Sequence, residues 1–447
     1  MRKHPFTRTI ALIGVAGTAV ALAGCQGAGS GADGGSATVT LRLWDEAAAE
    51  AYEQAIPSFE EANDGITIDV EVIPWADYWT SLRNDVASDS VSDIFWTNSS
   101  NFIDYVDAGA LLDIGETLGS DASADWSATV VEQYTYDGTL WGVPQLTDPG
   151  IGVFYNKALL DEAGVSVEEV ENLVWDPTGD DDTLRDVAAW LTKDSDGRGP
   201  SDPDFDPLTL TQFGYNAAYD FQAIWADYLA SAGAVFQPAD SDELAFDTPE
   251  GVAATEYLVD LINTDHVAPS AADTNDNGDF SRDQFLQGHL ALFQTGAYNL
   301  ANIRDGADFE WGIAPLPEGP EGRISLTNGI IAAASSQSEH PDAQKKVLEW
   351  LGSVEGASAL GTTGAALPAV TAAQQSFFDY WQSEGVDVSP LIDVLDNGTI
   401  SAPHGAKISE AFTAIAPVLK EVFLGRTPVD EGLTAAQAAG NDAIAGN

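Results

Sequence analysis

Apolar and polar residues alternate along the first part of the chain in a pattern that predicts strands and helices in turn. Residues 38–43 place Val, Leu and Leu on one face and Thr, Thr and Arg on the other, which indicates a half-buried strand. Apolar side chains then recur at helical spacing over 52–59, and a second alternating stretch covers 66–72. A helical pattern over 79–86 and a short strand over 93–96 repeat this succession. Strand, helix and strand in turn are typical of an α/β fold.

Unusual residues follow these predicted strands. Trp44 and Asp45 come directly after the first strand, and Trp96 and Asn98 stand at the end of a later one. In open α/β sheets, ligands bind beyond the carboxyl ends of the strands. We therefore expect a ligand site at this edge of the sheet.

The rest of the chain is predicted to be mainly helical around one irregular insertion. The insertion covers residues 173–206, which are rich in Asp, Pro and Gly, and it contains a helix at 184–191. Further helices are expected at 217–232, 249–263, 342–351 and 409–424.

The amino-terminal segment has the pattern of an export signal. Three basic residues precede an uncharged run over residues 10–23, which is shorter than the roughly twenty residues that cross a bilayer as a helix. The run closes on Leu22, Ala23, Gly24 and Cys25, which resembles the lipobox of bacterial lipoproteins. That resemblance implies acylation of Cys25 after removal of residues 1–24. The alternative is an ordinary cleavage site beside a free cysteine. Residues 25–36, mostly Gly, Ala and Ser, are predicted to be a flexible tether.

The charge of the chain restricts its partners. The full sequence has 71 acidic and 17 basic residues, and removal of residues 1–24 takes away three basic residues and no acidic residue, which leaves a formal charge of −57. Phosphate backbones and anionic lipid surfaces repel such a polyanion, so no nucleic-acid partner is expected. Cys25 is the only cysteine, which excludes a disulfide framework and a thiolate zinc site. About 420 residues exceed one ordinary core and favour two lobes.

Several segments together resemble a known family. Residues 140–144, Asp148 and residues 153–157 are similar to the "GVP…D…YNK" segment of extracellular solute-binding proteins of carbohydrate ABC importers, the maltose-binding-protein-like family. Other similar segments occur in the family's order, at 291–298, 312–317, 350–352 and 364–368. The resemblance covers nearly the whole chain from about residue 37.

The resemblance implies an α/β periplasmic-binding-protein-like fold with two lobes, hinge crossovers and a ligand cleft between the lobes. Its lobe boundaries would be 37–146 and 316–360 for the amino-terminal lobe, and 147–315 and 361–447 for the carboxyl-terminal lobe. The crossings are expected near Gln145 to Asp148, near Ala314 to Leu316, and within Ser353 to Leu367. Ligand contact with both lobes would stabilise the closed state.

A sugar site needs aromatic rings for the C–H faces and polar side chains for the hydroxyls. The aromatic candidates are Trp44, Trp75, Trp96, Trp225 and Tyr298. The resemblance assigns stacking most directly to Trp96 and to Tyr298, which follows Gly296. The polar candidates are Asp45, Glu46, Asn98, Asp148 and Asn328. Core packing is the alternative role for each Trp, and turn or capping chemistry is the alternative for the polar residues.

Neither a metal ion nor a cofactor is expected. The residues from Asp273 to Asp279 follow the first half of a calcium loop, but Gln284 stands where the loop needs a bidentate carboxylate. Acidic loops are common in a chain with so many carboxylates.

Two other classes of protein remain as alternatives. A secreted glycosidase would also have a Trp-rich cleft with carboxylate pairs. The sequence contains no G-x-S-x-G, H-E-x-x-H or P-loop motif, and only five histidines. A receptor for peptides or metal chelates is the third class. A peptide carboxylate calls for an Arg in the cleft, and Arg42 is the only Arg in the matched aromatic segments.

The sequence therefore predicts a carbohydrate receptor without enzymatic activity. We expect a monomer held by its lipid on the outer face of the cytoplasmic membrane, where it would hand a sugar to the permease of an ABC importer.

Overall fold

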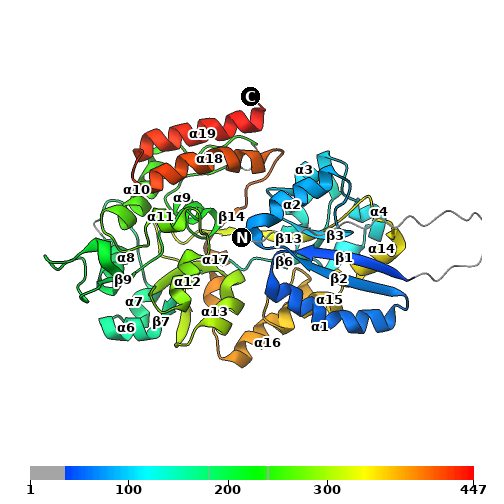
Figure 1. Cartoon of the computed structure of the whole chain (residues 1–447), viewed down its shortest axis with the longest axis horizontal. Helices are drawn as coiled ribbons and strands as arrows, with labels where there is room; N and C mark the ends of the chain where they lie inside the picture. Colours follow the sequence, from blue (N-terminus) through cyan, green and yellow to red (C-terminus); the bar gives the residue numbers. More distant parts are fainter. Residues whose placement is uncertain (1–35, 180, 239–240, 447) are drawn as a thin grey trace, which may run out of the picture. The chain divides into compact units, whose positions relative to one another are not determined.

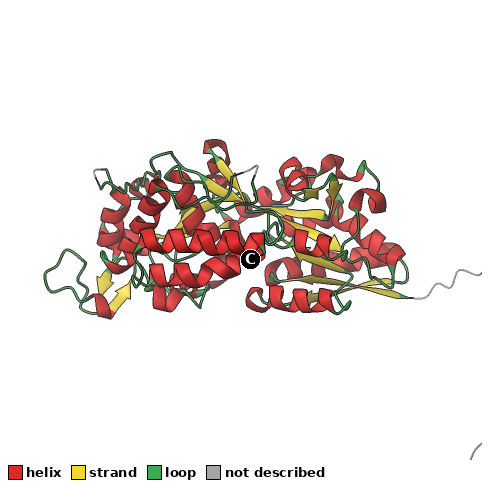
Figure 2. Ribbon diagram, turned by 90° about the horizontal axis from the view of Figure 1, so that it is seen from above, coloured by secondary structure: helices red, strands yellow, loops and turns green. Residues whose placement is uncertain are grey.

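Two β-sheets organise the chain, and each sheet has its own set of helices (Figures 1 and 2). The computed structural model describes residues 36–179, 181–238 and 241–446. The predicted export signal and Cys25 lie outside the described residues. The expected α/β fold is confirmed, because parallel strands alternate with helices at the start of the described chain.

The first sheet has the strand order β2-β1-β3-β13-β6. Strand β1 is parallel to β2 and β3, whereas β13 is antiparallel to β3 and β6. Helices α1, α14 and α15 contribute to the core on one face, and α2 and α3 contribute to the core on the other (Figure 1). The elements of this first lobe are β1 Ala37–Leu43, α1 Glu46–Ala62, β2 Ile66–Val72, α2 Trp75–Ala87, β3 Ile94–Thr97, α3 Phe102–Asp107, α4 Ile114–Leu118, η1 Ala122–Asp125, α5 Ala128–Gln133, β4 Thr135–Tyr136, β5 Thr139–Leu140, β6 Val143–Thr147, β13 Gly329–Ala334, α14 Pro341–Leu351, α15 Val354–Thr362 and η5 Thr371–Ala373.

The second sheet has the order β10-β7-β11, and both neighbours are antiparallel to β7. Helices α18 and α19 lie side by side and pack on α10 (Figure 1). The elements of this second lobe are β7 Ile151–Asn156, α6 Lys157–Ala163, α7 Val167–Glu171, α8 Thr183–Leu191, β8 Lys193–Asp194, η2 Pro207–Thr209, β9 Leu210–Gln212, η3 Phe221–Trp225, α9 Ala226–Ser231, α10 Pro249–Asn263, α11 Ala271–Thr274, α12 Phe280–Leu286, β10 Leu292–Gly296, η4 Ala297–Asn299, α13 Leu300–Gly306, β11 Trp311–Ala314, β12 Ser325–Thr327, α16 Gln375–Glu384, α17 Ser389–Asn397, β14 Thr399–Ser401, α18 Ile408–Phe423 and α19 Val429–Ala445.

Local sequence signals set most of the predicted helices. Helix α10 has the predicted bounds, since Thr248 caps its first turn and Pro249 fits the first helical position. Asp182 and Asp45 cap α8 and α1 through their side chains in the same way. The predictions of helices at 184–191, 249–263, 342–351 and 409–424 are confirmed to within one residue at each end.

The predicted helix over 217–232 begins later than its apolar pattern indicates. The side chain of Asn216 exchanges hydrogen bonds with the backbone of Gln294 in β10, with its Nδ2 donating at 3.0 Å and its Oδ1 accepting at 2.7 Å. This pairing ties the segment to a strand. Asp220 then caps a π-helical turn, η3, which leads into α9. A tertiary contact therefore overrides the local helical pattern over 217–220.

The chain passes between the two sheets at positions that the strand pairing defines. It leaves the first sheet after Thr147 and enters the second at Ile151, close to the first expected crossing. It returns at Asn328, between β12 and β13, rather than at Ala314 to Leu316. Leu316 remains in the core of the second lobe, and the backbone N–H of Leu326 donates to buried Asp227 at 2.7 Å. These contacts keep residues 315–327 with the second lobe.

A third segment lies along β6 near the end of the range expected for the last crossing. The N–H of Thr147 donates to the carbonyl of Leu367, and the N–H of Ala369 donates to the carbonyl of Gln145, both at 3.0 Å. Three stretches of backbone therefore run beside one another where the lobes join.

Among the described helices, none is both long and apolar enough to span a membrane.

Candidate ligand-binding site

Five aromatic rings gather at the carboxyl ends of β1 and β3, and we call them the aromatic platform. Trp44 directly follows β1. The centroid of its ring lies 5.2 Å from the ring centroid of Trp75, 5.0 Å from that of Tyr78, and 5.4 Å from those of Trp79 and Trp96. Most of these contacts are edge-to-face, an arrangement that the aromatic quadrupole favours. Trp44, Trp75 and Trp96, three of the aromatic candidates from the sequence, therefore lie together, and Trp75 belongs to the start of α2.

The rings of the platform differ in accessibility, and this corrects one prediction. Trp75 is 52% exposed, and Trp44 is partly exposed, whereas Trp96 is only 1% exposed. The hydroxyl of buried Tyr78 donates to the carbonyl of Trp96 at 2.7 Å and fixes the end of β3. Trp96 therefore supports Trp44 from behind, and it offers no face to a ligand in this structure, in contrast to its predicted stacking role.

The polar residues predicted at the same edge have local roles. Asp45 accepts a hydrogen bond from the N–H of Ala48 at 2.8 Å and caps α1, and burial raises the pKa of its carboxyl. Glu46 is exposed in the first turn of α1. Asn98 is buried and accepts a hydrogen bond from the Nδ2 of Asn101 at 2.8 Å. Capping and turn chemistry, the alternatives left open by the sequence, are therefore present at Asp45 and Asn98.

The platform is connected to the hinge through Tyr52. The ring of Tyr52 lies 6.2 Å from that of Trp96, and its hydroxyl donates to the Oε1 of buried Gln145 in β6 at 2.7 Å. Gln145 stands three residues before Asp148, so a continuous set of contacts links the aromatic platform to the crossing.

Asp148 occupies the hinge and joins three segments. Its N–H donates to the carbonyl of Asn328 at 2.8 Å, its Oδ2 accepts from the Nε2 of Gln222 at 2.7 Å, and its Oδ1 accepts from the N–H of Gly150 at 3.3 Å. The side chain is buried, and this burial raises the pKa of Asp148 to about 7, although both side-chain hydrogen bonds act against the rise. A carboxyl in this position changes its charge near neutral pH.

Two further carboxyls stand near Asp148, and the sequence analysis missed both. Asp227 is buried, and its Oδ2 has no hydrogen-bond partner in the structure. Burial raises its pKa strongly, and the charges of Asp220 and Asp148 raise it further. Asp220 caps η3 and is exposed, yet desolvation by the surrounding protein raises its pKa. A carboxyl whose pKa is shifted by its surroundings is a candidate for a functional site.

The only available signal for Asp220 was its position as a helix cap. Its side chain accepts from the N–H of Ala223, three residues later, which is the spacing of a capping residue. No local pattern marks Gln222 or Asp227, because their roles depend on proximity to Asp148 and Leu326.

Tyr298 adds an aromatic ring from the second lobe. It follows Gly296 at the end of β10, and a Cβ at Gly296 would overlap the Tyr298 ring, so glycine is required there. Tyr298 is 39% exposed. Its pKa is raised, first by the surrounding protein and then by the charges of Asp220 and Asp148, which places the hydroxyl within their field. The charges of Asp220 and Asp148 therefore both act on the Tyr298 hydroxyl.

Two other predicted residues have contacts within the protein. Trp225 is fully buried in the second lobe, and its Nε1 donates to the Oγ1 of Thr255 at 2.9 Å. Its assignment as a ligand residue is therefore corrected to core packing. The Oδ1 of Asn328 accepts from the Nε2 of Gln133 at 3.1 Å, and this contact holds the returning hinge segment.

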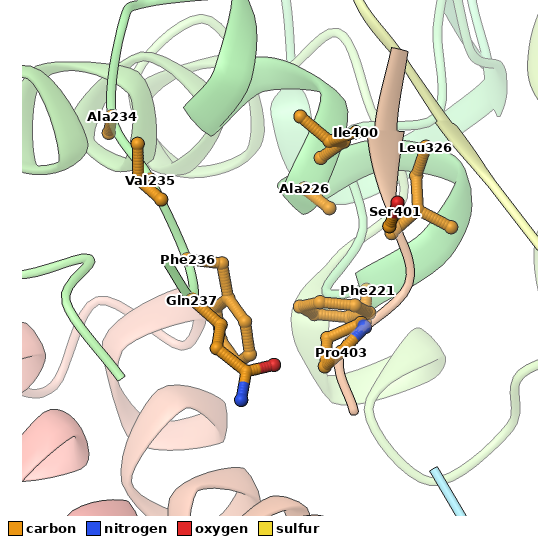
Figure 3. Close-up of a pocket in the computed structure, with 10 residues that line it drawn as sticks. All are labelled: Phe221, Ala226, Ala234, Val235, Phe236, Gln237, Leu326, Ile400, Ser401 and Pro403. Atoms are coloured by element: carbon orange, nitrogen blue, oxygen red, sulfur yellow. The ribbon is translucent and has the colours of Figure 1, made fainter. Parts of the chain in front are cut away.

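A pocket in the second lobe lies next to this hinge region (Figure 3). Its cavity volume is about 50 Å³, and its lining is mostly apolar. Phe221 lines it and directly precedes Gln222, the partner of Asp148. The lining residues are Phe221, Ala226, Ala234, Val235, Phe236, Gln237, Leu326, Ile400, Ser401 and Pro403.

Within the described residues, no group of three or more His, Cys, Asp or Glu side chains could hold a metal ion.

The chain belongs to the bacterial extracellular solute-binding proteins, a family that matches it over residues 41–358. The crystal structure of M. tuberculosis UspC is 51% identical, covers 91% of this chain and 100% of its own, and superposes with a TM-score of 0.71. The Listeria monocytogenes ABC substrate-binding protein in complex with cycloalternan is 20% identical, covers 91% of this chain and 99% of its own, and has a TM-score of 0.78. A binding protein of Brucella abortus (strain 2308) is 22% identical over 72% of this chain and 73% of its own. These matches confirm the two-lobed fold.

Proposed function

We propose that this protein is the carbohydrate-binding receptor of an ABC importer. The observation that carries the proposal is the pairing of an exposed aromatic surface at Trp75 and Trp44 with a hinge carboxyl, Asp148, and a half-exposed ring of the second lobe, Tyr298. A sugar has apolar faces that stack on aromatic rings and hydroxyls that bond to carboxylates. A ligand that contacts both the aromatic platform and the hinge would stabilise the closed state of the lobes.

Related proteins support this class of ligand. The Listeria structure holds cycloalternan, a Bdellovibrio bacteriovorus relative holds maltotriose, and a Streptomyces coelicolor relative binds diacetylchitobiose. We propose that this chain likewise binds a sugar or short oligosaccharide, releases it unchanged to a permease, and works as a monomer.

A panel of sugars tests the proposal. The full-length protein is titrated with mono- and oligosaccharides, and intrinsic Trp fluorescence and the melting temperature are recorded. At a sugar concentration one hundred times the Kd, binding stabilises the folded state by about 2.7 kcal/mol, so a rise in Tm is expected for the true ligand. A saturable response to a peptide but to no sugar would contradict the proposal, and the release of new reducing ends would favour the glycosidase alternative.

We also propose that Cys25 carries the lipid that holds the receptor on the outer face of the membrane. The predicted export signal and the single cysteine support this anchor, because the strongly acidic chain would not bind an anionic lipid surface by itself. Stable anchoring needs more than one acyl chain, which lipoprotein acylation supplies.

Replacement of Cys25 by Ser is expected to release the protein from the membrane fraction while leaving sugar binding intact. Fractionation followed by immunoblotting measures the release, and Ser30→Ala in the same segment is the control that should stay on the membrane. Retention of the Cys25→Ser variant on the membrane would show that the anchor lies elsewhere.

A further inference from the structure

A short segment after β14 reaches from the second lobe to the first, and we call residues 402–407 the strap. Strand β14 is parallel to β12, and the N–H of Ala402 donates to the carbonyl of Thr327 at 3.2 Å. Because β12 is the strand from which the chain crosses to β13, the strap runs alongside the hinge in the same direction. Ala406 packs against the core of the first lobe that includes Tyr105 of α3.

The end of the strap is bound by a carboxylate of the first lobe. The Oδ1 of Asp104 in α3 accepts from the N–H of Lys407 at 3.1 Å, and its Oδ2 accepts from the hydroxyl of Ser409 at 2.7 Å. Lys407 has a φ of 61° and stands at the N-cap position of α18. The Asp104 carboxylate therefore contacts the residues on either side of Ile408, the first residue of α18.

Helix α18 needs a capping group from outside its own segment. The first N–H groups of a helix lack partners within the helix, and Lys407 has no side-chain oxygen that could accept from them. Asp104 supplies two acceptor atoms at the positive end of the 16-residue helix. Asp104 thus accepts from one of these N–H groups, that of Lys407, and from the Ser409 hydroxyl.

The strap is also part of the wall of the pocket in Figure 3. Pro403 lines the pocket together with Gln237, whose Nε2 donates to the carbonyl of His404 at 2.8 Å and whose Oε1 accepts from its N–H at 2.9 Å. On the other side, Asp104 follows the Asn98 turn at the end of β3. The Asp104 contact therefore joins two elements that border the candidate site.

We propose that Asp104 and the strap form a latch between the lobes that stabilises the lobe arrangement of this structure and thereby sets ligand affinity. Separation of α3 from the strap would remove the acceptors of the Lys407 N–H and of the Ser409 hydroxyl. The effect on affinity rests on the proposed function, capture of a sugar by lobe closure. Asp104 is a positioning residue, since it acts through the strap.

The test compares Asp104→Ala with Asp107→Asn, which removes the same charge from an exposed position of the same helix. Spin labels are placed on cysteines introduced at exposed Lys345 in α14 and exposed Glu256 in α10, in the full-length Cys25→Ser background, which has no other cysteine. Double electron–electron resonance then gives the distance between the lobes without ligand, and Trp fluorescence gives the Kd for the sugar found in the panel.

Asp104→Ala is expected to shift and broaden the ligand-free distance distribution and to change Kd about three- to tenfold. Asp107→Asn should leave the distance unchanged and Kd within about twofold. Ser409→Ala deletes only one of the two contacts and should give an intermediate effect, so it serves if Asp104→Ala folds poorly. Unchanged distances in both Asp104→Ala and Ser409→Ala would overturn the latch. Failure of the wild-type protein to bind any sugar would instead overturn the proposed function.

Discussion

Trp75→Ala is expected to weaken sugar binding by about tenfold or more while changing the stability of the unliganded protein little. Trp75 exposes half of its side chain and contacts Trp44 and Trp79 at 5.2 and 5.1 Å. Loss of its face removes stacking area worth about 1.5–3 kcal/mol when fully covered by a ligand. Isothermal titration calorimetry gives the change in Kd, and thermal unfolding without ligand gives the change in stability.

Trp190→Ala is the matched control. Trp190 in α8 is 51% exposed, nearly the same as Trp75 at 52%, but it lies in the second lobe and outside the aromatic platform. Both substitutions therefore delete the same chemical group with the same exposure. Equal losses of affinity in the two variants, or none in Trp75→Ala, would show that the platform does not bind the sugar.

Asp148→Asn is expected to stabilise the unliganded protein at pH 8 and to weaken sugar binding. The folded state holds the pKa of Asp148 at about 7, above the ordinary value of 3.8, because burial disfavours the carboxylate. At a pH between these two pKa values, the folded protein retains a proton that the unfolded chain has lost. The free energy of unfolding therefore falls as the pH rises from 3.8 to about 7, and this contribution no longer changes above that range. The full shift corresponds to on the order of 4 kcal/mol.

Asp148→Asn removes this dependence of stability on pH, but it also loses part of the hydrogen bonding to the N–H of Gly150. We expect a net gain in the free energy of unfolding of about 2 kcal/mol at pH 8 and a smaller gain at pH 5. Affinity for the sugar should fall about tenfold, since an amide is a weaker acceptor for ligand hydroxyls than a carboxylate. Urea unfolding at the two pH values and calorimetric titration measure both effects.

Asp194→Asn supplies a control of opposite sign. Desolvation raises the pKa of Asp194, but hydrogen bonds from the backbone of Arg198, Asp206 and Asp196 and from the Arg198 side chain together lower it to about 2. Its contribution to stability is present above the ordinary pKa of 3.8 and is lost as pH falls towards 2. The variant should therefore lose stability at both pH 5 and pH 8. A loss of stability in Asp148→Asn at pH 8 would contradict the burial argument.

Sequence reasoning succeeded where the signal was local. The bounds of α10 follow from Thr248, Pro249 and a helical repeat, and the strand-end position of Trp44 follows from the alternation before it. The hinge at Asp148 came from a resemblance in short motifs, and the structure places this residue between β6 and β7. Such features depend on residues near one another in the chain.

The same reasoning failed where accessibility decided the role. Trp96 and Trp225 have the residue type of a sugar platform, yet both are buried, and only the packing of other elements on them reveals this. Asp220, Gln222 and Asp227 have no local signal for a place beside the hinge.

The sequence by itself determined the α/β order of elements, the acidic surface, the family and most helix ends. Each of these depends on composition or on short-range periodicity and capping. Only the tertiary structure decided which aromatic rings are exposed, where the chain returns to the first sheet, and that Asp104 accepts from the N–H of Lys407, 303 residues later. These features depend on contacts between residues far apart in the chain, and neither residue type nor spacing encodes the partner of such a contact.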